Sequence, residues 1–188
     1  MIVPFVFVGA VLSSRECRLL RSAASAAGWE TATILRGSKS VLNKRVRNAR
    51  VSRLEAPSSE ISTIIEKIIS TARCISESAF NISITQPEAV LRIVRYETGG
   101  KYKWHIDHGR GIAARRKISI VVQLSAEKEY TGGSLLIRAR GGIYEAPKLQ
   151  GTVIVFPSKR TVHALQPLSS GIRYSGVLWL SHATKQNR

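Results

Sequence analysis

The feature that most constrains the fold is a change of hydrophobic period near residue 88. Beyond it, apolar and polar residues alternate in five short runs, the pattern of strands with one buried face. Glycine pairs and Pro-Ser or Ser-Gly turns separate the runs, at the spacing typical of an antiparallel sandwich or barrel. The runs are Val90–Tyr96, Ile118–Leu124, Ser134–Arg138, Thr152–Phe156 and Tyr174–Leu180. The second half of the chain therefore predicts a jelly roll.

Upstream of this change, the apolar period is helical. Apolar residues recur at three and four positions over residues 61–75, which is the stripe of an amphipathic helix. Pro57 precedes it, and Ser58 or Ser59 can cap its first turn.

The N-terminal segment predicts one strand and one more helix. Met1–Leu12 is rich in Val and Phe and predicts a buried strand that ends near Gly9. The helix that follows can be capped by Ser13 or Ser14, and Gly28 can end it.

These patterns predict a mainly β fold with flanking helices (α+β): a double-stranded β-helix, or jelly roll, buttressed by N-terminal helices. A length of 188 residues fits a single domain. We expect residues 1–88 to form an N-terminal strand and helical support region, and residues 89–181 to form the jelly-roll core. Residues 181–188 are expected to be a frayed tail.

Neither a membrane span nor a secretory leader is expected. The longest apolar stretch, Met1–Leu12, contains Pro4, lacks a basic leader and is shorter than the roughly 20 residues of a spanning helix. Cys17 and Cys74 lack CxxC spacing, which argues against a disulfide framework and a zinc ribbon. We therefore expect a cytoplasmic protein.

The formal net charge of +17 is unusual, and the densest basic segment spans residues 36–53. It is expected to form a loop and a short strand, Val46–Leu54. Its basic residues are Arg36, Lys39, Lys44, Arg45, Arg47, Arg50 and Arg53. Such a segment attracts phosphate, so nucleic acid is a candidate partner, although the segment lacks aromatic residues that stack on bases. It could equally be a solubilising surface, or a substrate loop over an active-site mouth.

The residues best suited to metal chemistry are His105 and Asp107, the only aspartate in the chain. Residues i and i+2 of an extended segment point to the same side, so both side chains can reach one point. His163, at the start of a later strand, can supply a third ligand if the two strands face each other. Two histidines and one carboxylate leave metal positions open, as in non-haem Fe(II) oxygenases. A zinc hydrolase is an alternative use of the same ligands.

Arg173 and Ser175 also share one face of a strand and could grip an anion. A guanidinium binds a carboxylate through two parallel hydrogen bonds, and the hydroxyl adds another. The flanks of Arg173 are apolar, and a buried arginine needs an anionic partner. The alternative is a surface arginine on a strand.

Five sequence blocks, in this order and spacing, resemble the prolyl-hydroxylase-like branch of the Fe(II)/2-oxoglutarate dioxygenases. The blocks run from Tyr96 to Asp107, Lys117 to Ser125, Tyr130 to Leu136, Gly151 to Ser158, and then His163 with Arg173. The resemblance covers roughly residues 90–181, and a weaker similarity lies around Val46–Leu54.

The resemblance implies Fe(II) held by His105, Asp107 and His163. It further implies that 2-oxoglutarate chelates this iron while Arg173 binds its distal carboxylate, with O2 as co-reactant and ascorbate as a further candidate cofactor. Tyr96 is then a second contact to the cosubstrate, and Tyr102 lines the pocket. For both tyrosines, a role as a strand-edge aromatic is the alternative.

Gln123 departs from the family pattern, since many prolyl hydroxylases have a cosubstrate-binding tyrosine there. It could donate an amide hydrogen to the carboxylate, or be a solvent-facing strand residue. His108 should lie on the side opposite Asp107, and His182 in the tail, so both are expected at the surface.

The resemblance implies hydroxylation of a C–H bond of a peptidyl or amino-acid substrate, coupled to oxidative decarboxylation of 2-oxoglutarate. Basic residues beside the His105 block could steer an acidic substrate or form a solvated rim. They are Lys101, Lys103, Arg110, Arg115, Arg116 and Lys117. A nucleic-acid oxidative demethylase is an alternative, but such enzymes typically carry an arginine where this chain has Trp179. A non-catalytic jelly-roll binding protein is the other alternative.

Overall fold

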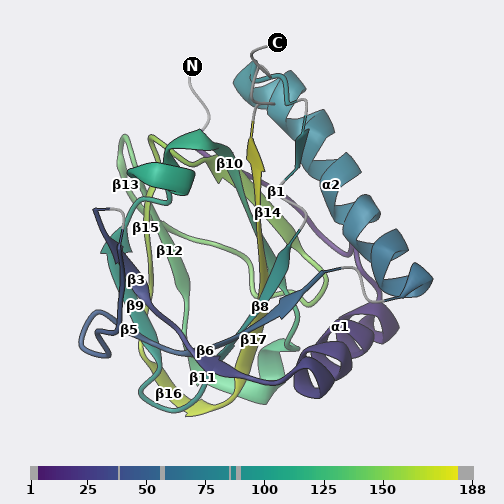
Figure 1. The fold of residues 1–188 in the computed structure, drawn as a ribbon, viewed down its shortest axis with the longest axis vertical. Coiled ribbons are helices and arrows are strands. Elements are labelled where there is room, and N and C mark those ends of the chain that lie inside the picture. Colours follow the sequence, from purple (N-terminus) through teal and green to yellow (C-terminus); the bar gives the residue numbers. More distant parts are fainter. Residues whose placement is uncertain (1–3, 38, 56–57, 85, 88–89, 182–188) are drawn as a thin grey trace.

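The computed structural model describes residues 4–37, 39–55, 58–84, 86–87 and 90–181. Two antiparallel sheets face each other across a central space, and two helices cover the outer face of the larger sheet (Figure 1). This arrangement confirms the predicted jelly roll with supporting helices.

The larger sheet has eight strands. They are β1 Val6–Val8, β2 Glu30–Thr31, β6 Arg50–Leu54, β7 Gln86–Pro87, β8 Leu91–Tyr96, β10 Arg116–Gln123, β14 Val153–Pro157 and β17 Arg173–Ser181. Their order is β1-β14-β10-β17-β8-β6-β2, and β7 pairs with β17. Four of the five strands predicted from period 2 therefore lie side by side in this sheet.

The smaller sheet has five strands, in the order β13-β12-β15-β9-β5. They are β5 Arg47–Asn48, β9 Lys101–His105, β12 Leu135–Ala139, β13 Gly142–Glu145 and β15 Val162–Leu165. Two separate pairs complete the β structure: β3 Ile34–Arg36 with β4 Lys39–Val41, and β11 Tyr130–Gly132 with β16 Leu168–Gly171. Short 3-10 turns span Gly111–Arg115 and Glu127–Glu129.

Both predicted helices are confirmed. Helix α1 spans Ser14–Ala27, with Ser13 as its N-cap in a capping box with Glu16. Gly28 ends it in a backbone conformation with φ of 89°, which favours glycine. Helix α2 spans Ser59–Phe80, and the side chain of Ser58 caps its first turn.

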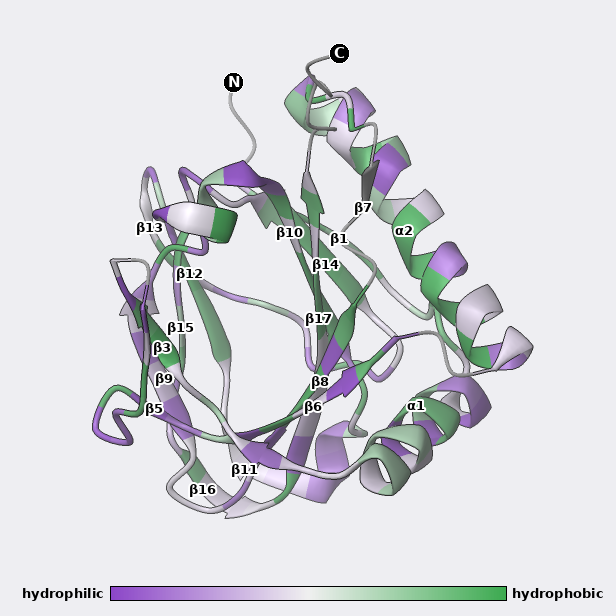
Figure 2. Ribbon diagram, viewed as in Figure 1, coloured by the Kyte–Doolittle hydropathy of each residue, from purple (hydrophilic) through white to green (hydrophobic). Residues whose placement is uncertain are grey.

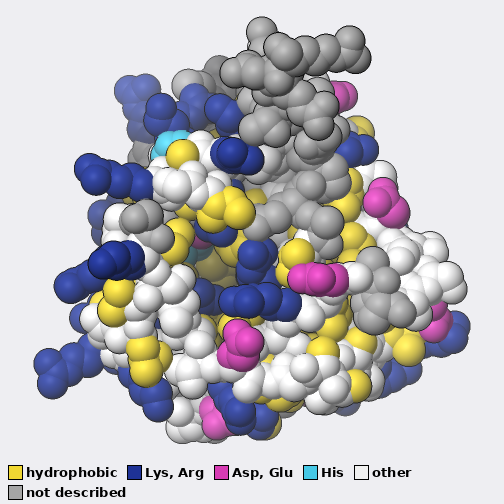
Figure 3. Space-filling view, in the orientation of Figure 1, with side chains coloured by type: hydrophobic (Ala, Val, Ile, Leu, Met, Phe, Trp, Pro, Cys, Tyr) yellow, Lys and Arg dark blue, Asp and Glu magenta, His cyan; other side chains and the backbone are white. Residues whose placement is uncertain are grey.

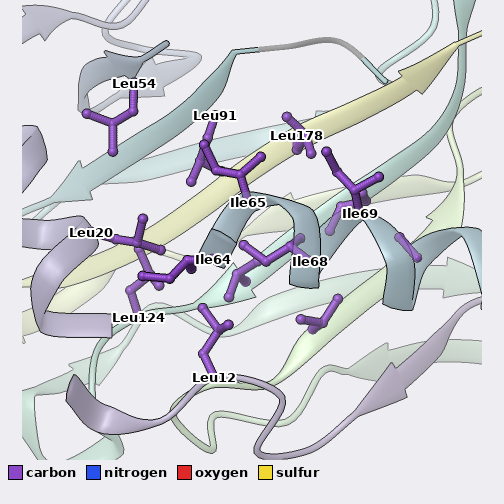
Figure 4. Packing of buried hydrophobic residues seen from close by; sticks show 14 of the residues in the cluster. Leu12, Leu20, Leu54, Ile64, Ile65, Ile68, Ile69, Leu91, Leu124 and Leu178 are labelled. Atoms are coloured by element: carbon purple, nitrogen blue, oxygen red, sulfur yellow. The ribbon is translucent and has the colours of Figure 1, made fainter. Parts of the chain in front are cut away.

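The apolar faces of both helices pack against the back of the larger sheet (Figure 2). Leu20 of α1 and Ile64 and Ile68 of α2 meet Leu91 and Leu178 of the sheet in a continuous buried cluster (Figure 4). Each such side chain contributes roughly 1.5–3 kcal/mol when it is fully buried. The helices thus cover one face of the sheet and leave the other face to the space between the sheets.

Several predicted boundaries differ from the observed ones. Within Met1–Leu12, of which residues 1–3 lie outside the described part, only Val6–Val8 forms a strand. It lies at the edge of the larger sheet, so Phe7 remains 51% exposed. The Ser-Gly turn expected between two of the runs, at residues 169–171, is instead part of strand β16, where Ser170 pairs with Thr131 of β11.

The predicted strand Val46–Leu54 is two strands in different sheets. Strand β5 pairs with β9 in the smaller sheet and β6 with β8 in the larger one, with Ala49 between them. The N-terminal half therefore contributes strands to both sheets, in addition to the supporting helices.

Neither helix in the described part of the chain has the length and hydropathy that a bilayer crossing requires. Cys17 and Cys74 lie in α1 and α2 as free thiols, the first buried and the second exposed.

Replacing Ser13 with alanine should lower the free energy of unfolding by about 1 kcal/mol, because the first turn of α1 loses the side-chain acceptor of its capping box. Ser14→Ala is the matched control: the Ser14 hydroxyl donates to the Gln150 side chain and does not accept from the first turn of the helix. Chemical denaturation of both variants checks this, and an equal loss in both would contradict it.

Candidate active site

Two histidines face each other on neighbouring strands of the smaller sheet. His163 of β15 is the direct cross-strand partner of His105 of β9, and Asp107 lies two residues beyond His105. The Nε2 atoms of His105 and His163 each lie 3.7 Å from a different carboxylate oxygen of Asp107. One ligand atom from each residue falls within 4.8 Å of the others. The structure therefore brings the three residues of the predicted metal site together.

Backbone carbonyls fix the orientation of both imidazoles. Nδ1 of His105 contacts the carbonyl of Lys103 at 2.8 Å, and Nδ1 of His163 contacts that of Thr161 at 3.2 Å. A ring nitrogen facing a carbonyl must carry the hydrogen, so each Nε2 lone pair points to the shared centre. Burial, followed by the proximity of His163, holds the pKa of His105 well below its ordinary value. A neutral imidazole is the form that binds metal.

The Asp107 carboxyl favours its charged form. Burial opposes ionisation, but the two imidazoles and then the side chains of Ser119 and Trp179 outweigh it and lower the pKa of Asp107. The site thus presents one carboxylate and two imidazole nitrogens, a donor set suited to a divalent metal.

A β-bulge places Tyr102 on the same side as His105. The three residues His163–Leu165 of β15 oppose the four residues Tyr102–His105 of β9, so Tyr102 and His105 both face the space between the sheets. Their rings stack with centroids 3.5 Å apart, and the guanidinium of Arg47 lies over the Tyr102 ring, 4.7 Å from its centroid. Burial raises the pKa of Tyr102 to about 12, so its hydroxyl stays neutral.

Arg173 is a fully buried cation at the start of β17, with 1% of its surface exposed. Its Nη2 donates to the Gln123 side-chain oxygen at 2.5 Å, while Nε is buried without a hydrogen-bond partner among the described residues. Tyr96 is its cross-strand partner, and the guanidinium lies 5.9 Å from the Tyr96 ring centroid. Ser175 follows on the same face. The alternative of a surface arginine is therefore wrong.

Gln123 is also buried, and its amide nitrogen donates to the Pro147 carbonyl at 3.2 Å. The solvent-facing alternative is therefore wrong for this residue too. Both ends of its side chain have partners, so Gln123 orients Arg173.

One cavity of about 570 Å³ collects these groups between the two sheets. It is lined by the metal-site residues and by Tyr96, Tyr102, Arg173 and Ser175. Figure 3 shows a hollow in this face of the molecule, with Lys and Arg side chains around it. Gln123 does not line the cavity directly.

The basic segment lies at this cavity. Ser40, Arg47 and Arg53 line it, as do residues of the β3–β4 hairpin such as Leu35. Of the interpretations left open for residues 36–53, a loop at the active-site mouth agrees best with this position.

The remaining expectations concern residues near the ligands. Among the six basic residues expected at the mouth, only Arg110 and Arg116 line the cavity. His108 also lines it and is half-buried rather than fully exposed; among the described residues it does not join the grouped metal-ligand candidates. His182 lies outside the described residues.

No sequence pattern predicted a cavity position for Arg92 or Trp179, and Arg53 was expected there only as part of the basic segment. All three line the cavity. The alternation of strand faces could have predicted two of these positions, because Arg92 shares a strand face with Tyr96, and Trp179 shares one with Arg173.

The fold and the site define a class: jelly-roll proteins with a candidate divalent-metal site beside a buried arginine. A family model of the 2OG-Fe(II) oxygenase superfamily matches residues 91–181. A PKHD-type hydroxylase of Delftia acidovorans is 31% identical over 181 residues, covering 92% of this chain and 76% of the relative. Another, from Synechococcus sp. (strain CC9605), is 34% identical over 130 residues, covering 69% of this chain and 58% of the relative.

Solved structures share the fold. A Pseudomonas putida prolyl-4-hydroxylase superposes with a TM-score of 0.76 at 17% identity, covering 96% of this chain and 94% of that one. A prolyl hydroxylase from Trichoplax adhaerens superposes with a TM-score of 0.78 at 18% identity, covering 95% and 83%. The chain belongs to the 2OG-Fe(II) oxygenase superfamily, in its prolyl-hydroxylase-like branch. It spans little more than half the length of the Synechococcus relative.

The residues present fit the groups that this family uses. Two imidazole lone pairs and a charged carboxylate converge, which suits Fe(II). The buried guanidinium of Arg173 has an Nε with no acceptor among the described residues, and the Ser175 hydroxyl lies on the same strand face, which suits the carboxylate of a dicarboxylic acid.

Proposed function

We propose that the chain is an Fe(II)- and 2-oxoglutarate-dependent oxygenase that hydroxylates a C–H bond of a peptidyl or amino-acid substrate. One observation carries this proposal: the Nε2 atoms of His105 and His163 converge on the Asp107 carboxylate inside a cavity that also contains the buried Arg173. A zinc hydrolase would use the three ligands but would leave Arg173 and Ser175 without a function.

His105, Asp107 and His163 would hold the iron. Bound iron and 2-oxoglutarate supply the activation of O2 that protein side chains cannot provide. The contribution of the protein is placement. The carbonyls of Lys103 and Thr161 keep both imidazoles in the ligand orientation, and the Tyr102 ring packs against His105.

Arg173 and Ser175 would bind the distal carboxylate of 2-oxoglutarate. Gln123 would act through Arg173, because it accepts from the guanidinium and is anchored to the Pro147 carbonyl. Tyr96 would be a further contact, since it is the cross-strand partner of Arg173 and lines the cavity.

The substrate would enter from the side of the β3–β4 hairpin, next to Tyr102. A peptide substrate is supported by the Trichoplax prolyl hydroxylase, which was solved in complex with a peptide fragment. The free thiols of Cys17 and Cys74 agree with a cytoplasmic location.

Anaerobic reconstitution with Fe(II), with and without 2-oxoglutarate, tests the function. After O2 is admitted in the presence of a peptide library, we expect each turnover to place one oxygen atom from O2 in the hydroxylated peptide and to form one succinate. Iron binding without any 2-oxoglutarate consumption would contradict the proposal. If 2-oxoglutarate were consumed only in the presence of a methylated oligonucleotide library, the substrate would be a nucleic acid and not a peptide.

A further inference from the structure

We propose that the outer face of the smaller sheet binds single-stranded RNA, on a surface separate from the active-site cavity. This surface, the basic strip, consists of exposed cationic side chains with one exposed tryptophan among them. Its members are Lys44 and Arg45 before β5, Lys103 and Trp104 of β9, Arg138 of β12 and Arg140 in the turn after β12. None of these residues lines the cavity, so RNA binding here would need neither iron nor 2-oxoglutarate.

The outer face of the smaller sheet is open. Helices α1 and α2 pack on the larger sheet, and no α-helix in the described part of the chain lies over β12, β15, β9 or β5 (Figure 1). Ile137 is buried opposite His163, which lines the cavity, so this pair faces inward. The next pair, Arg138 and Val162, therefore faces outward. An open sheet face with an aromatic side chain is a platform on which RNA-binding folds stack bases.

Positive and negative charges are separated on the molecule. The strands of the smaller sheet contain one acidic residue, Glu145, which accepts from Ser134 and pairs with Lys148. Both helices, in contrast, carry acidic residues. These are Glu16 in α1 and Glu60, Glu66 and Glu77 in α2. Figure 3 shows Lys and Arg side chains on the side where the smaller sheet lies, whereas Asp and Glu appear at the centre and toward the helices. A surface with one sign of charge attracts a polyanion.

The fold supplies the aromatic residue that the basic segment of residues 36–53 lacks. The backbone amide of Lys103 donates to the carbonyl of Val46, which places the turn with Lys44 and Arg45 beside the strand that carries Trp104. Other basic residues of the segment line the cavity, but these two do not. The segment is thus divided between the cavity and the outer face.

Arg138 orients the indole of Trp104 and leaves part of it accessible. The guanidinium lies 4.6 Å from the ring centroid, and 38% of the surface of Trp104 is exposed. Bases stack on aromatic rings and on guanidinium planes, while lysine and arginine contact phosphates without regard to sequence. The cationic groups of the basic strip make no ion pair with a described acidic residue. They therefore remain available to phosphate.

A lipid membrane fits this surface less well than RNA does. An interfacial surface combines basic residues with a broad apolar face. The exposed large apolar side chains on the described outer face are Trp104 and, at the sheet edge, Ile143, whereas Leu35, Ile106 and Ile112 lie at the cavity. RNA is favoured over DNA because it is the nucleic acid whose single-stranded loops and ends expose unstacked bases.

Fluorescence anisotropy of a labelled oligouridine of about 12 nucleotides, a length within the site sizes of single-strand binding domains, tests the basic strip. We expect saturable binding by the full chain, with the logarithm of the affinity falling linearly with the logarithm of the salt concentration. Trp104→Ala should weaken binding at least about fivefold, because a stacked base is lost, and should leave the salt slope unchanged. Trp104→Phe keeps a ring for stacking and should restore most of the affinity.

A double charge variant tests the phosphate contacts. Arg45→Gln combined with Lys103→Gln should lower the magnitude of the salt slope by about 1.4, since each phosphate contact to a single strand contributes about 0.7. Arg15→Gln combined with Arg18→Gln is the matched control, because it removes the same charge from α1, on the side of the helices. The control should keep the slope. Thermal unfolding of each variant shows that it is folded.

Absence of saturable binding by the unmodified protein would overturn the proposal and leave the basic strip a solubilising surface. An equal loss in the α1 control would also overturn it, because binding would then follow net charge alone. Tighter binding of the matching DNA strand would overturn the choice of RNA, and binding of anionic lipid vesicles without binding of RNA would identify a membrane surface.

The same titration with and without bound Fe(II) and 2-oxoglutarate keeps this proposal separate from the proposed function. We expect equal RNA affinities, since the basic strip lies outside the cavity. RNA binding that required iron would place the RNA at the cavity and overturn the separate surface. Absence of RNA binding together with normal 2-oxoglutarate turnover would contradict only the RNA surface.

Discussion

Asp107→Ala is expected to abolish iron binding at stoichiometric metal. Within the described part of the chain, the variant removes the only carboxylate that faces both imidazoles, and it leaves two neutral nitrogen ligands. Loss of a residue that merely supports a ligand often costs about 10–100-fold in metal affinity, so loss of the ligand itself should cost more. Iron content after anaerobic loading and desalting measures this effect, and 2-oxoglutarate turnover should disappear with it.

Glu97→Gln provides the control, because it removes an exposed carboxylate that pairs with Arg95 and does not line the cavity. It should keep the full iron content. Thermal unfolding of the metal-free proteins shows whether Asp107→Ala is folded. A folded Asp107→Ala protein with unchanged iron content would exclude this ligand set.

Local sequence patterns predicted the regular elements well. Helix α2 follows from the three- and four-residue spacing of its isoleucines, and α1 begins after Ser13, one of the two serines predicted as its cap. Strands such as β8 and β17 follow from the period of two in their apolar residues. In each case the pattern and the structure involve the same few neighbouring residues.

Elements that depend on distant partners were harder to predict. Strands β5 and β6 are separated only by Ala49, so their sequence looks continuous, and the crossing between sheets appears only with the partners β9 and β8. The β3–β4 hairpin pairs only with itself, and its position at the cavity depends on contacts with residues far along the chain.

In the candidate site, too, features set by neighbouring residues could be predicted, and features set by distant partners could not. The pair His105 and Asp107 follows from strand geometry, and His163 joins it because β15 lies next to β9. The bulge that turns Tyr102 toward His105 has no local sequence signal, since it is a mismatch between two strands. The hydrogen-bond partner of the Gln123 side chain could not be predicted from the sequence either, because a glutamine amide can both donate and accept hydrogen bonds.

Arg173→Leu is expected to raise the 2-oxoglutarate requirement at least about tenfold while iron stays bound. A buried carboxylate would lose a charge-assisted, two-pronged partner and remain desolvated, at a cost of about 2–4 kcal/mol. Calorimetric titration of 2-oxoglutarate into the iron-loaded protein measures the loss. Arg138→Leu is the matched control, because this arginine is exposed, stacks on Trp104 and does not line the cavity.

Gln123→Glu tests the same contact without removing the guanidinium. The new carboxylate would stand where the amide oxygen accepts from Arg173, and it would compete with 2-oxoglutarate for that cation. We therefore expect weaker 2-oxoglutarate binding in Gln123→Glu, with iron binding retained because the metal ligands lie on β9 and β15 and in the segment after β9. If both Arg173→Leu and Gln123→Glu bound 2-oxoglutarate as tightly as the unmodified protein does, the cosubstrate carboxylate would have to lie elsewhere in the cavity. Loss in Arg173→Leu alone would mean that the guanidinium can turn from residue 123 to the ligand.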